Sequence, residues 1–185
     1  MNIIVAITGA SGSIYAQRLI WYLEKSPAVD KIAVVFSGNA IKIYHQETGG
    51  ELAAGGKVQI YQPADFSAPF ASGSSQYHAM VVCPCSMGTL GRIAGGISDS
   101  LITRAADVMM KERRKLIVVP RETPFSLIHI RNMETLTLSG AIVCPANPSF
   151  YSAPNDISQL VDTVVFRLLD LLGVDNNGYR WGNEM

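Results

Sequence analysis

The chain has 185 residues, 48% of them hydrophobic and 16% charged, and fifteen Lys and Arg balance fifteen Asp and Glu. This length fits a single domain, residues 1–185, built around one hydrophobic core. Zero formal charge excludes the broad basic surface of a general nucleic-acid-binding protein and leaves room only for a local anion pocket. Because little net repulsion keeps copies apart, we expect a homo-oligomer.

The first element is an apolar run at residues 3–7 with no basic lead and no small-residue cleavage site. It is therefore interpreted as a strand and not as a signal peptide, and we expect a cytoplasmic protein. No apolar stretch reaches the roughly 18 to 20 residues that span a bilayer, so no membrane contact is expected. Five more runs rich in Val and Ile follow at residues 31–36, 58–61, 79–83, 115–119 and 141–144. They scarcely alternate, which is typical of parallel strands buried on both faces.

Segments with helical spacing separate these runs. The first carries an apolar stripe formed by Tyr15, Leu19, Tyr22 and Leu23. Further helices are predicted over residues 39–48, 87–94 and 99 to about 114. Alternation of strands and helices predicts a three-layer α/β/α domain with a mostly parallel, Rossmann-like (flavodoxin-like) sheet.

Two later helices are predicted from their end signals. Thr123 as N-cap and Pro124 as first helical residue predict a helix that ends at Gly140. The last helix should be capped by Asn155 or Asp156 and end at Gly173. The tail, about residues 174–185, is expected to be either an interface arm or disordered.

Ligands of open parallel sheets bind beyond the carboxyl ends of the strands. The first such loop contains Gly9, Ala10 and Ser11, small residues that let backbone N–H groups and a helix N-terminus approach a phosphate. It lacks the Gly-x-Gly-x-x-Gly pattern, and no acid ends the second strand, so a mononucleotide is favoured over a dinucleotide. A tight turn that needs glycine for backbone reasons alone is the alternative.

Short segments that contain hydroxyl side chains follow two further strands and open helices: Ser37 after the second strand, and Ser86, Met87, Gly88 and Thr89 after the fourth. Repeated hydroxyls at one edge exceed what turns require and indicate an oxygen-rich ligand, although for Ser86 taken alone a role as N-cap is favoured.

Arg121 and Glu122 follow the fifth strand, where an anion clamp beside a proton-transfer carboxyl is favoured over a solvated ion pair. Cys83, Cys85 and Cys144 have neither zinc nor redox spacing, and the first two are expected to be buried at a strand end. The three histidines are scattered, so no metal site is predicted.

Several segments closely resemble the UbiX-type flavin prenyltransferases, also named phenylacrylic acid decarboxylase-like or 3-octaprenyl-4-hydroxybenzoate carboxy-lyase-like flavoproteins. The matching stretches are residues 9–12, 83–90, 98–108, 120–124 and 145–151, and the similarity covers essentially the whole chain. The resemblance implies an FMN site made by Gly9, Ala10, Ser11, Ser37, Ser86, Met87, Gly88, Thr89 and Arg121. It implies a prenyl phosphate site made by Lys111, Arg121, Tyr151 and Arg167, with Glu122 handling protons and Ser11 and Glu47 near the flavin.

By the same resemblance, a dimethylallyl group passes from dimethylallyl monophosphate to N5 and then C6 of reduced FMN, without a metal. The sites would lie between subunits of a homo-oligomer, a dodecamer in this family, and the product would pass to a UbiD-type decarboxylase.

Two other functions compete with this one. An FMN-dependent cysteine decarboxylase is disfavoured because no His lies between Ser13 and Lys25 and no Pro-Ala-Ser-Ala-Asn-Thr motif is present. A non-catalytic FMN-binding partner subunit is disfavoured because Arg121, Glu122 and Tyr151 provide for a second phosphate that storage does not need.

Overall fold

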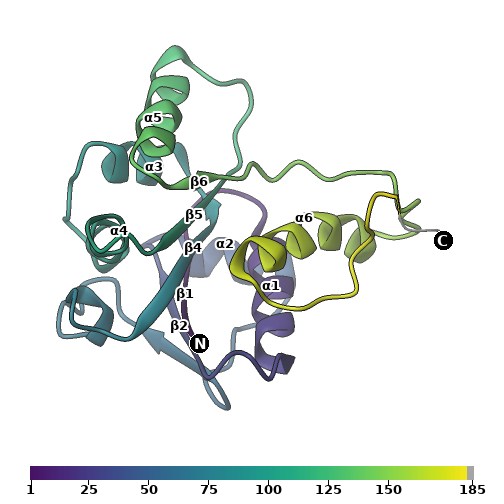
Figure 1. The fold of residues 1–185 in the computed structure, drawn as a ribbon, viewed down its shortest axis with the longest axis horizontal. Helices are drawn as coiled ribbons and strands as arrows, with labels where there is room; N and C mark the ends of the chain where they lie inside the picture. The colour runs from purple at the N-terminus through teal and green to yellow at the C-terminus, as the bar shows by residue number, and fades with distance from the viewer. Residues whose placement is uncertain (183–185) are drawn as a thin grey trace.

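A computed structural model describes residues 1–182 of the chain. Its centre is a six-stranded sheet in which all the paired strands are parallel, in the order β3-β2-β1-β4-β5-β6 (Figure 1). The strands are β1 (Asn2–Ile7), β2 (Lys31–Phe36), β3 (Val58–Tyr61), β4 (Tyr77–Cys85), β5 (Lys115–Pro120) and β6 (Ile142–Val143). This strand order is that of the Rossmann fold. Successive strands are added on one side of β1 up to β3 and on its other side from β4 on, so the switch point of the sheet lies between β1 and β4. The predicted three-layer, Rossmann-like class is confirmed.

Helices cover both faces of the sheet. They are α1 (Ser13–Lys25), α2 (Ala40–Thr48), α3 (Met87–Ala94), α4 (Leu101–Lys111), α5 (Leu127–Leu138) and α6 (Ile157–Leu172), with a short 3-10 turn, η1 (Pro69–Ala71). Side chains of α1, α2 and α6 form one hydrophobic cluster with the sheet, and those of α3, α4 and η1 form the other, joined at its margin by α5 (Figure 1).

Burial on both faces explains why the strands do not alternate in sequence. In β1, Ile3 and Val5 belong to the cluster under α1 and α6, whereas Ile4 and Ala6 belong to the cluster under α3 and α4. All four side chains are fully buried, and burying an isoleucine or valine side chain contributes about 1.5–3 kcal/mol. The sheet is therefore held from both sides, which fixes the positions of the loops that leave its carboxyl edge.

The helix that follows β5 starts later than its sequence signals predict. The Thr123-Pro124 start is wrong: α5 begins at Leu127, after a cap by Ser126. The Ser126 hydroxyl accepts a hydrogen bond from the His129 N–H at 3.2 Å, and His129 Nδ1 accepts one from the Ser126 N–H at 3.2 Å. This reciprocal capping box satisfies the N–H groups of Ser126 and His129.

The end signals of α6 are confirmed. Asp156, one of the two expected caps, accepts a hydrogen bond from the Gln159 N–H at 2.8 Å, and Gly173 ends the helix with φ at 78°. Beyond Gly173 the chain turns back along α6 (Figure 1). Residues 183–185 of the predicted tail lie outside the described residues, and its role as an interface arm stays a prediction. Within residues 1–182, no helix combines the length and hydropathy that crossing a bilayer requires.

Candidate flavin nucleotide site

Four loops leave the carboxyl edge of the sheet beside the switch point. The register places the last residues of neighbouring strands together: Ile7 pairs with Phe36, and Cys85 pairs with Pro120. The residues directly after these strands, among them Ser37, Ser86 and Arg121, therefore meet at one edge, as the sequence predicted.

Thr8 ties the first of these loops to the loop after β4. Its fully buried hydroxyl donates to the Pro84 carbonyl at 2.7 Å and accepts from the Ser86 N–H at 2.8 Å. Sequence reasoning assigned Thr8 no role, because a small polar residue in a glycine-rich loop gives no signal of a partner 76 residues away. The bridge sets the distance between the Gly9–Ser11 segment and the start of α3.

The start of α1 is capped by an acidic side chain from α2. Glu47 Oε2 accepts hydrogen bonds from the N–H groups of Gly12 at 2.8 Å and Ser13 at 2.7 Å. Burial opposes ionisation of this carboxyl, but hydrogen bonds from the Ser11 side chain and the two N–H groups outweigh it and hold the pKa of Glu47 below its usual value. The Glu47 carboxylate thus occupies the N–H groups of Gly12 and Ser13, and the approach of a phosphate to the start of α1 stays a prediction. Glu47 and Ser11 are together, as the resemblance implied.

Gly12 allows this close approach. Its φ of 111° is a conformation that residues with a Cβ rarely adopt, and an added Cβ would lie 3.1 Å from the Tyr15 ring. The alternative that the loop needs glycine for backbone reasons thus holds at Gly12. Gly9 has φ outside this region and is open, with an added Cβ meeting only Asn39 and Ile43 at 3.9 Å.

The start of α3 offers backbone donors and hydroxyls together. The Ser86 hydroxyl accepts from the Thr89 N–H at 3.4 Å and contacts the Thr89 hydroxyl at 3.1 Å, so the capping interpretation of Ser86 is confirmed. Met87 and Gly88 supply first-turn N–H groups, which a helix leaves without intrahelical partners. Thr89 also shares a hollow of about 200 Å³ with Ser37 and the α4 cap Ser100.

Arg121 reaches across to the first loop. Its Nε donates to the Ser11 carbonyl at 2.9 Å, while the neighbouring Glu122 carboxylate accepts from the Thr123 N–H at 3.0 Å. The two side chains thus have different partners, and the alternative of an ion pair between them is wrong. Both side chains are accessible to a ligand at the carboxyl edge of the sheet, because Arg121 is only half-buried and Glu122 is exposed.

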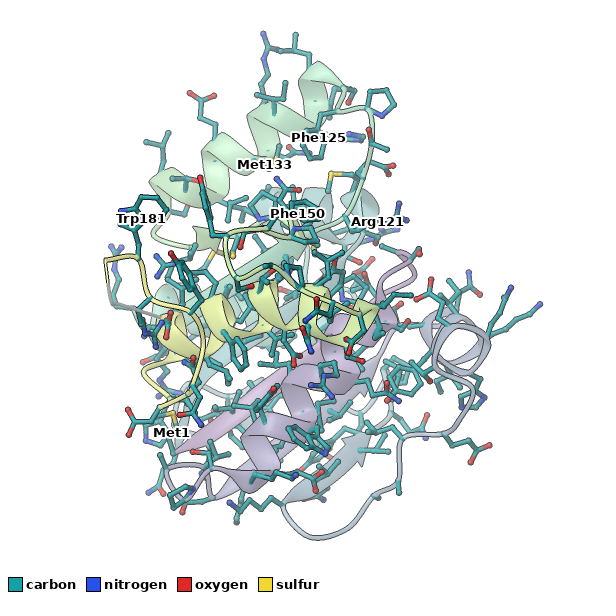
Figure 2. The ribbon with its side chains drawn as sticks, turned by 90° about the vertical axis from the view of Figure 1, so that its right-hand side faces the viewer. Met1, Arg121, Phe125, Met133, Phe150 and Trp181 are labelled. Atoms are coloured by element: carbon teal, nitrogen blue, oxygen red, sulfur yellow. The ribbon has the colours of Figure 1, made fainter. Side chains whose placement is uncertain are left out.

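A second cavity, of about 710 Å³, lies between α6 and the segment that follows β6. Tyr151 and Arg167 both line it, so the structure brings these two predicted residues together. The segment is attached to the sheet edge by the Ala146 N–H, which donates to the Pro120 carbonyl at 3.1 Å, next to Arg121. In Figure 2, Phe150 lies between Arg121 and Trp181 on the side of α6 that faces α5.

Lys111 lies at a different place in the folded chain from the residues just described. It ends α4, hydrogen-bonds to Glu112 at 2.8 Å, and sits beside Gly73 in the loop that leads into β4. Helices that connect parallel strands run antiparallel to them, so the end of α4 is at the amino edge of the sheet. One chain alone therefore does not bring Lys111 to Arg121, Tyr151 and Arg167.

Two of the three cysteines are structural. Cys83 and Cys85 are fully buried free thiols in β4, as predicted, and burial raises the pKa of Cys85 to about 12 and that of Cys83 further still. Neither is a nucleophile at neutral pH. Among residues 1–182, no three His, Cys, Asp or Glu side chains form a potential metal site.

The donors at the edge suit a flavin nucleotide. Backbone N–H groups of a small-residue loop and of a helix start, several hydroxyls and one guanidinium can bind ring carbonyls, ribitol hydroxyls and a phosphate without a metal. A Rossmann-order sheet with such donors at its switch point defines an α/β nucleotide-binding protein of the flavoprotein class.

Comparison with known proteins makes this class specific. The model of the Flavoprotein family matches residues 1–169. The chain is 46% identical to the flavin prenyltransferase UbiX of Methanocaldococcus jannaschii, over 98% of this chain and 99% of that protein. It thus belongs to the UbiX family of flavin prenyltransferases, as the resemblance implied.

Two solved structures have the same fold. AnUbiX (PadA1) in complex with FMN and dimethylallyl pyrophosphate superposes with a TM-score of 0.92 at 39% identity, covering 100% of this chain and 98% of that one. A dodecameric FMN-dependent UbiX-like decarboxylase from Escherichia coli O157:H7 gives 0.92 at 38% identity, covering 99% and 100%.

Proposed function

We propose that the chain transfers a dimethylallyl group from dimethylallyl monophosphate to N5 and C6 of reduced FMN. One structural observation supports this most: the loops suited to a flavin and the cavity lined by Tyr151 and Arg167 share one sheet edge, joined by the hydrogen bond between Ala146 and Pro120. An acceptor and a phosphorylated donor would thus meet beside Arg121. The family membership and the ligands of AnUbiX support the same reaction.

The flavin would be held by the residues that surround the switch point. When bound, reduced FMN supplies the nucleophilic atoms N5 and C6. Backbone N–H groups of Gly9, Ala10, Ser11, Met87 and Gly88, and the side chains of Ser37, Ser86, Thr89 and Arg121, would orient it. Because Glu47 occupies the start of α1, we assign the nucleotide phosphate to the hollow shared by Ser37 and Thr89.

The donor phosphate would lie in the cavity beside Tyr151 and Arg167. Cleavage of the allylic C–O bond leaves the bonding electrons on the phosphate, so cations and hydroxyl donors placed there stabilise the developing charge. Lys111 would come from a second copy of the chain, since its own fold places it at the opposite edge of the sheet.

Two carboxylates have separate tasks. Glu47 is ionised and accepts hydrogen bonds from the Ser11 loop, so it positions Ser11 against the flavin and does not donate a proton. Glu122 is exposed at the edge, and we assign it delivery of the proton that the prenyl double bond takes up as C6 bonds to it, with the departing phosphate as the base that removes the C6 proton.

The proposal includes an assembly. Large apolar side chains of α5 are exposed in the single chain, Leu127 by 61% and Ile128 by 69%, and a homo-oligomer would bury them. We propose a dodecamer, the state named for the Escherichia coli relative, with sites between subunits. A cytoplasmic location fits the three free thiols, and a UbiD-type decarboxylase would take up the product.

Anaerobic incubation with chemically reduced FMN and dimethylallyl monophosphate, with EDTA present, tests this function. The expected product, detected by mass spectrometry, is FMN heavier by one C5H8 unit, formed with release of phosphate. The diphosphate should be assayed in parallel. Unmodified flavin with both donors would contradict the proposal; decarboxylation of a cysteine peptide would favour the related cysteine decarboxylases, and flavin binding alone would favour a storage subunit.

A further inference from the structure

Asp170, on α6, lies between two arginines that line the donor cavity. Arg180 of the C-terminal segment donates from Nη1 to Oδ2 at 2.6 Å and from Nη2 to Oδ1 at 2.7 Å. Arg167, one helical turn before Asp170, has its Nη1 at 4.0 Å from the same Oδ2. All three residues line the cavity of about 710 Å³.

The two arginines compete for one carboxylate, and Arg180 has the better geometry. Its two short, parallel contacts form a bidentate pair, the strongest arrangement available to an arginine and a carboxylate. A separation of 4.0 Å for Arg167 lies outside hydrogen-bonding range. Asn176 adds a further donor, Nδ2 to Asp170 Oδ1 at 2.8 Å. Asp170 is thus satisfied without Arg167.

The charge of Asp170 also supports its pairing with Arg180 and not with Arg167. Hydrogen bonding from Arg180 is the main cause that lowers the pKa of Asp170, so the carboxylate is ionised at neutral pH. Without Arg180, this anion would lie one turn from Arg167, and residues three apart on a helix are neighbours that pair readily. A phosphate entering the cavity would then have to displace Asp170 from Arg167.

We propose that Arg180 is a positioning residue for the prenyl donor: by holding Asp170 in a bidentate pair, it leaves the guanidinium of Arg167 free for the donor phosphate. This inference rests on the proposed function, in which Arg167 binds that phosphate. It assigns the C-terminal segment a task in donor binding.

Three variants test the inference: Arg180→Gln, Asp170→Asn and the double variant. In each, KM for dimethylallyl monophosphate is measured at saturating reduced FMN, and the dissociation constant of the same donor is measured by calorimetry on protein loaded with oxidised FMN. Arg180→Gln should weaken donor binding roughly fivefold, the scale of one partly exposed charge pair, with kcat little changed. Asp170→Asn should bind the donor at least as well as the unmodified chain, and the double variant should match Asp170→Asn.

The double variant distinguishes competition for Asp170 from a role of the ion pair in anchoring the C-terminal segment. Asp170→Asn and Arg180→Gln both break this ion pair. If anchoring were its only role, all three variants would bind the donor equally weakly. That result, or an unchanged KM in Arg180→Gln, would overturn the inference. If the unmodified chain transfers no prenyl group, the proposed function fails instead, and calorimetry still reports whether Arg180 governs donor binding.

Discussion

Arg121 donates a hydrogen bond from Nε to the Ser11 carbonyl at 2.9 Å, across 110 residues of sequence. The contact joins the loop after β5 to the loop after β1, over the end of β4 that lies between them. The guanidinium thus spans the switch point of the sheet, where a flavin ring and the donor phosphate would meet.

Arg121→Gln should weaken both FMN binding and prenyl transfer, because it removes a cation and the bond to Ser11 together. Hydrogen bonds to charged groups contribute about 1.5–3 kcal/mol, so the dissociation constant of FMN, followed by flavin fluorescence, should rise by about tenfold or more. Lys31→Gln is the control: Lys31 is an exposed cation at the start of β2, at the opposite edge of the sheet from the switch-point loops. Equal FMN affinity in both variants would remove Arg121 from the site.

Gly12→Ala should destabilise the fold. The alanine would need a φ of 111°, and its Cβ would lie 3.1 Å from the Tyr15 ring, so we expect a loss of about 1–2 kcal/mol in the free energy of unfolding in urea. Gly50→Ala is the control, since nothing lies within 4 Å of its added Cβ and its φ is ordinary. A Gly12→Ala chain as stable as the control would show that the α1 loop can relax.

Features that depend on residues close together in the sequence could be predicted, whereas contacts between residues far apart in the sequence could not. Strand positions were predicted within two residues because apolar runs are local and burial on both faces leaves no alternation. The start of α5 was missed because two local signals competed, and the Ser126–His129 capping box prevailed over Thr123-Pro124. The Glu47 cap on α1 joins residues 35 apart, and nothing local in either segment indicates it. The assignment of Lys111 to the donor phosphate site came from the resemblance alone and stays a prediction, because within one chain Lys111 contacts Glu112 and lies away from Arg121.

Glu47→Gln should change how stability depends on pH. The folded-state pKa of Glu47 is lowered, so its contribution is fully present above the pKa of the unfolded chain and is lost as pH falls through the folded value. The unmodified chain should therefore melt at a higher temperature than Glu47→Gln near neutral pH, and this difference should shrink as the pH is lowered below the ordinary pKa of a glutamate and through the lower folded-state pKa. Melting followed by circular dichroism checks this. A difference that stays constant with pH would mean that the carboxylate charge is not what caps α1.

Thr163, which lines the donor cavity, should set the affinity for the prenyl donor through the segment that it holds in place. Its hydroxyl accepts from the Ser149 N–H at 3.0 Å and donates to the Leu160 carbonyl at 2.7 Å, so it holds the segment that carries Tyr151 against the helix that carries Arg167. Thr163→Val keeps the shape and removes the acceptor, and leaving the Ser149 N–H unpaired costs about 1–3 kcal/mol. We expect a rise of about fivefold or more in KM for dimethylallyl monophosphate, while the dissociation constant of FMN, held at the other end of the edge, stays the same. Thr163→Ser retains the hydroxyl and should restore the KM. If Thr163→Ser is as impaired as Thr163→Val, the methyl group matters and the hydrogen bond to Ser149 does not position Tyr151.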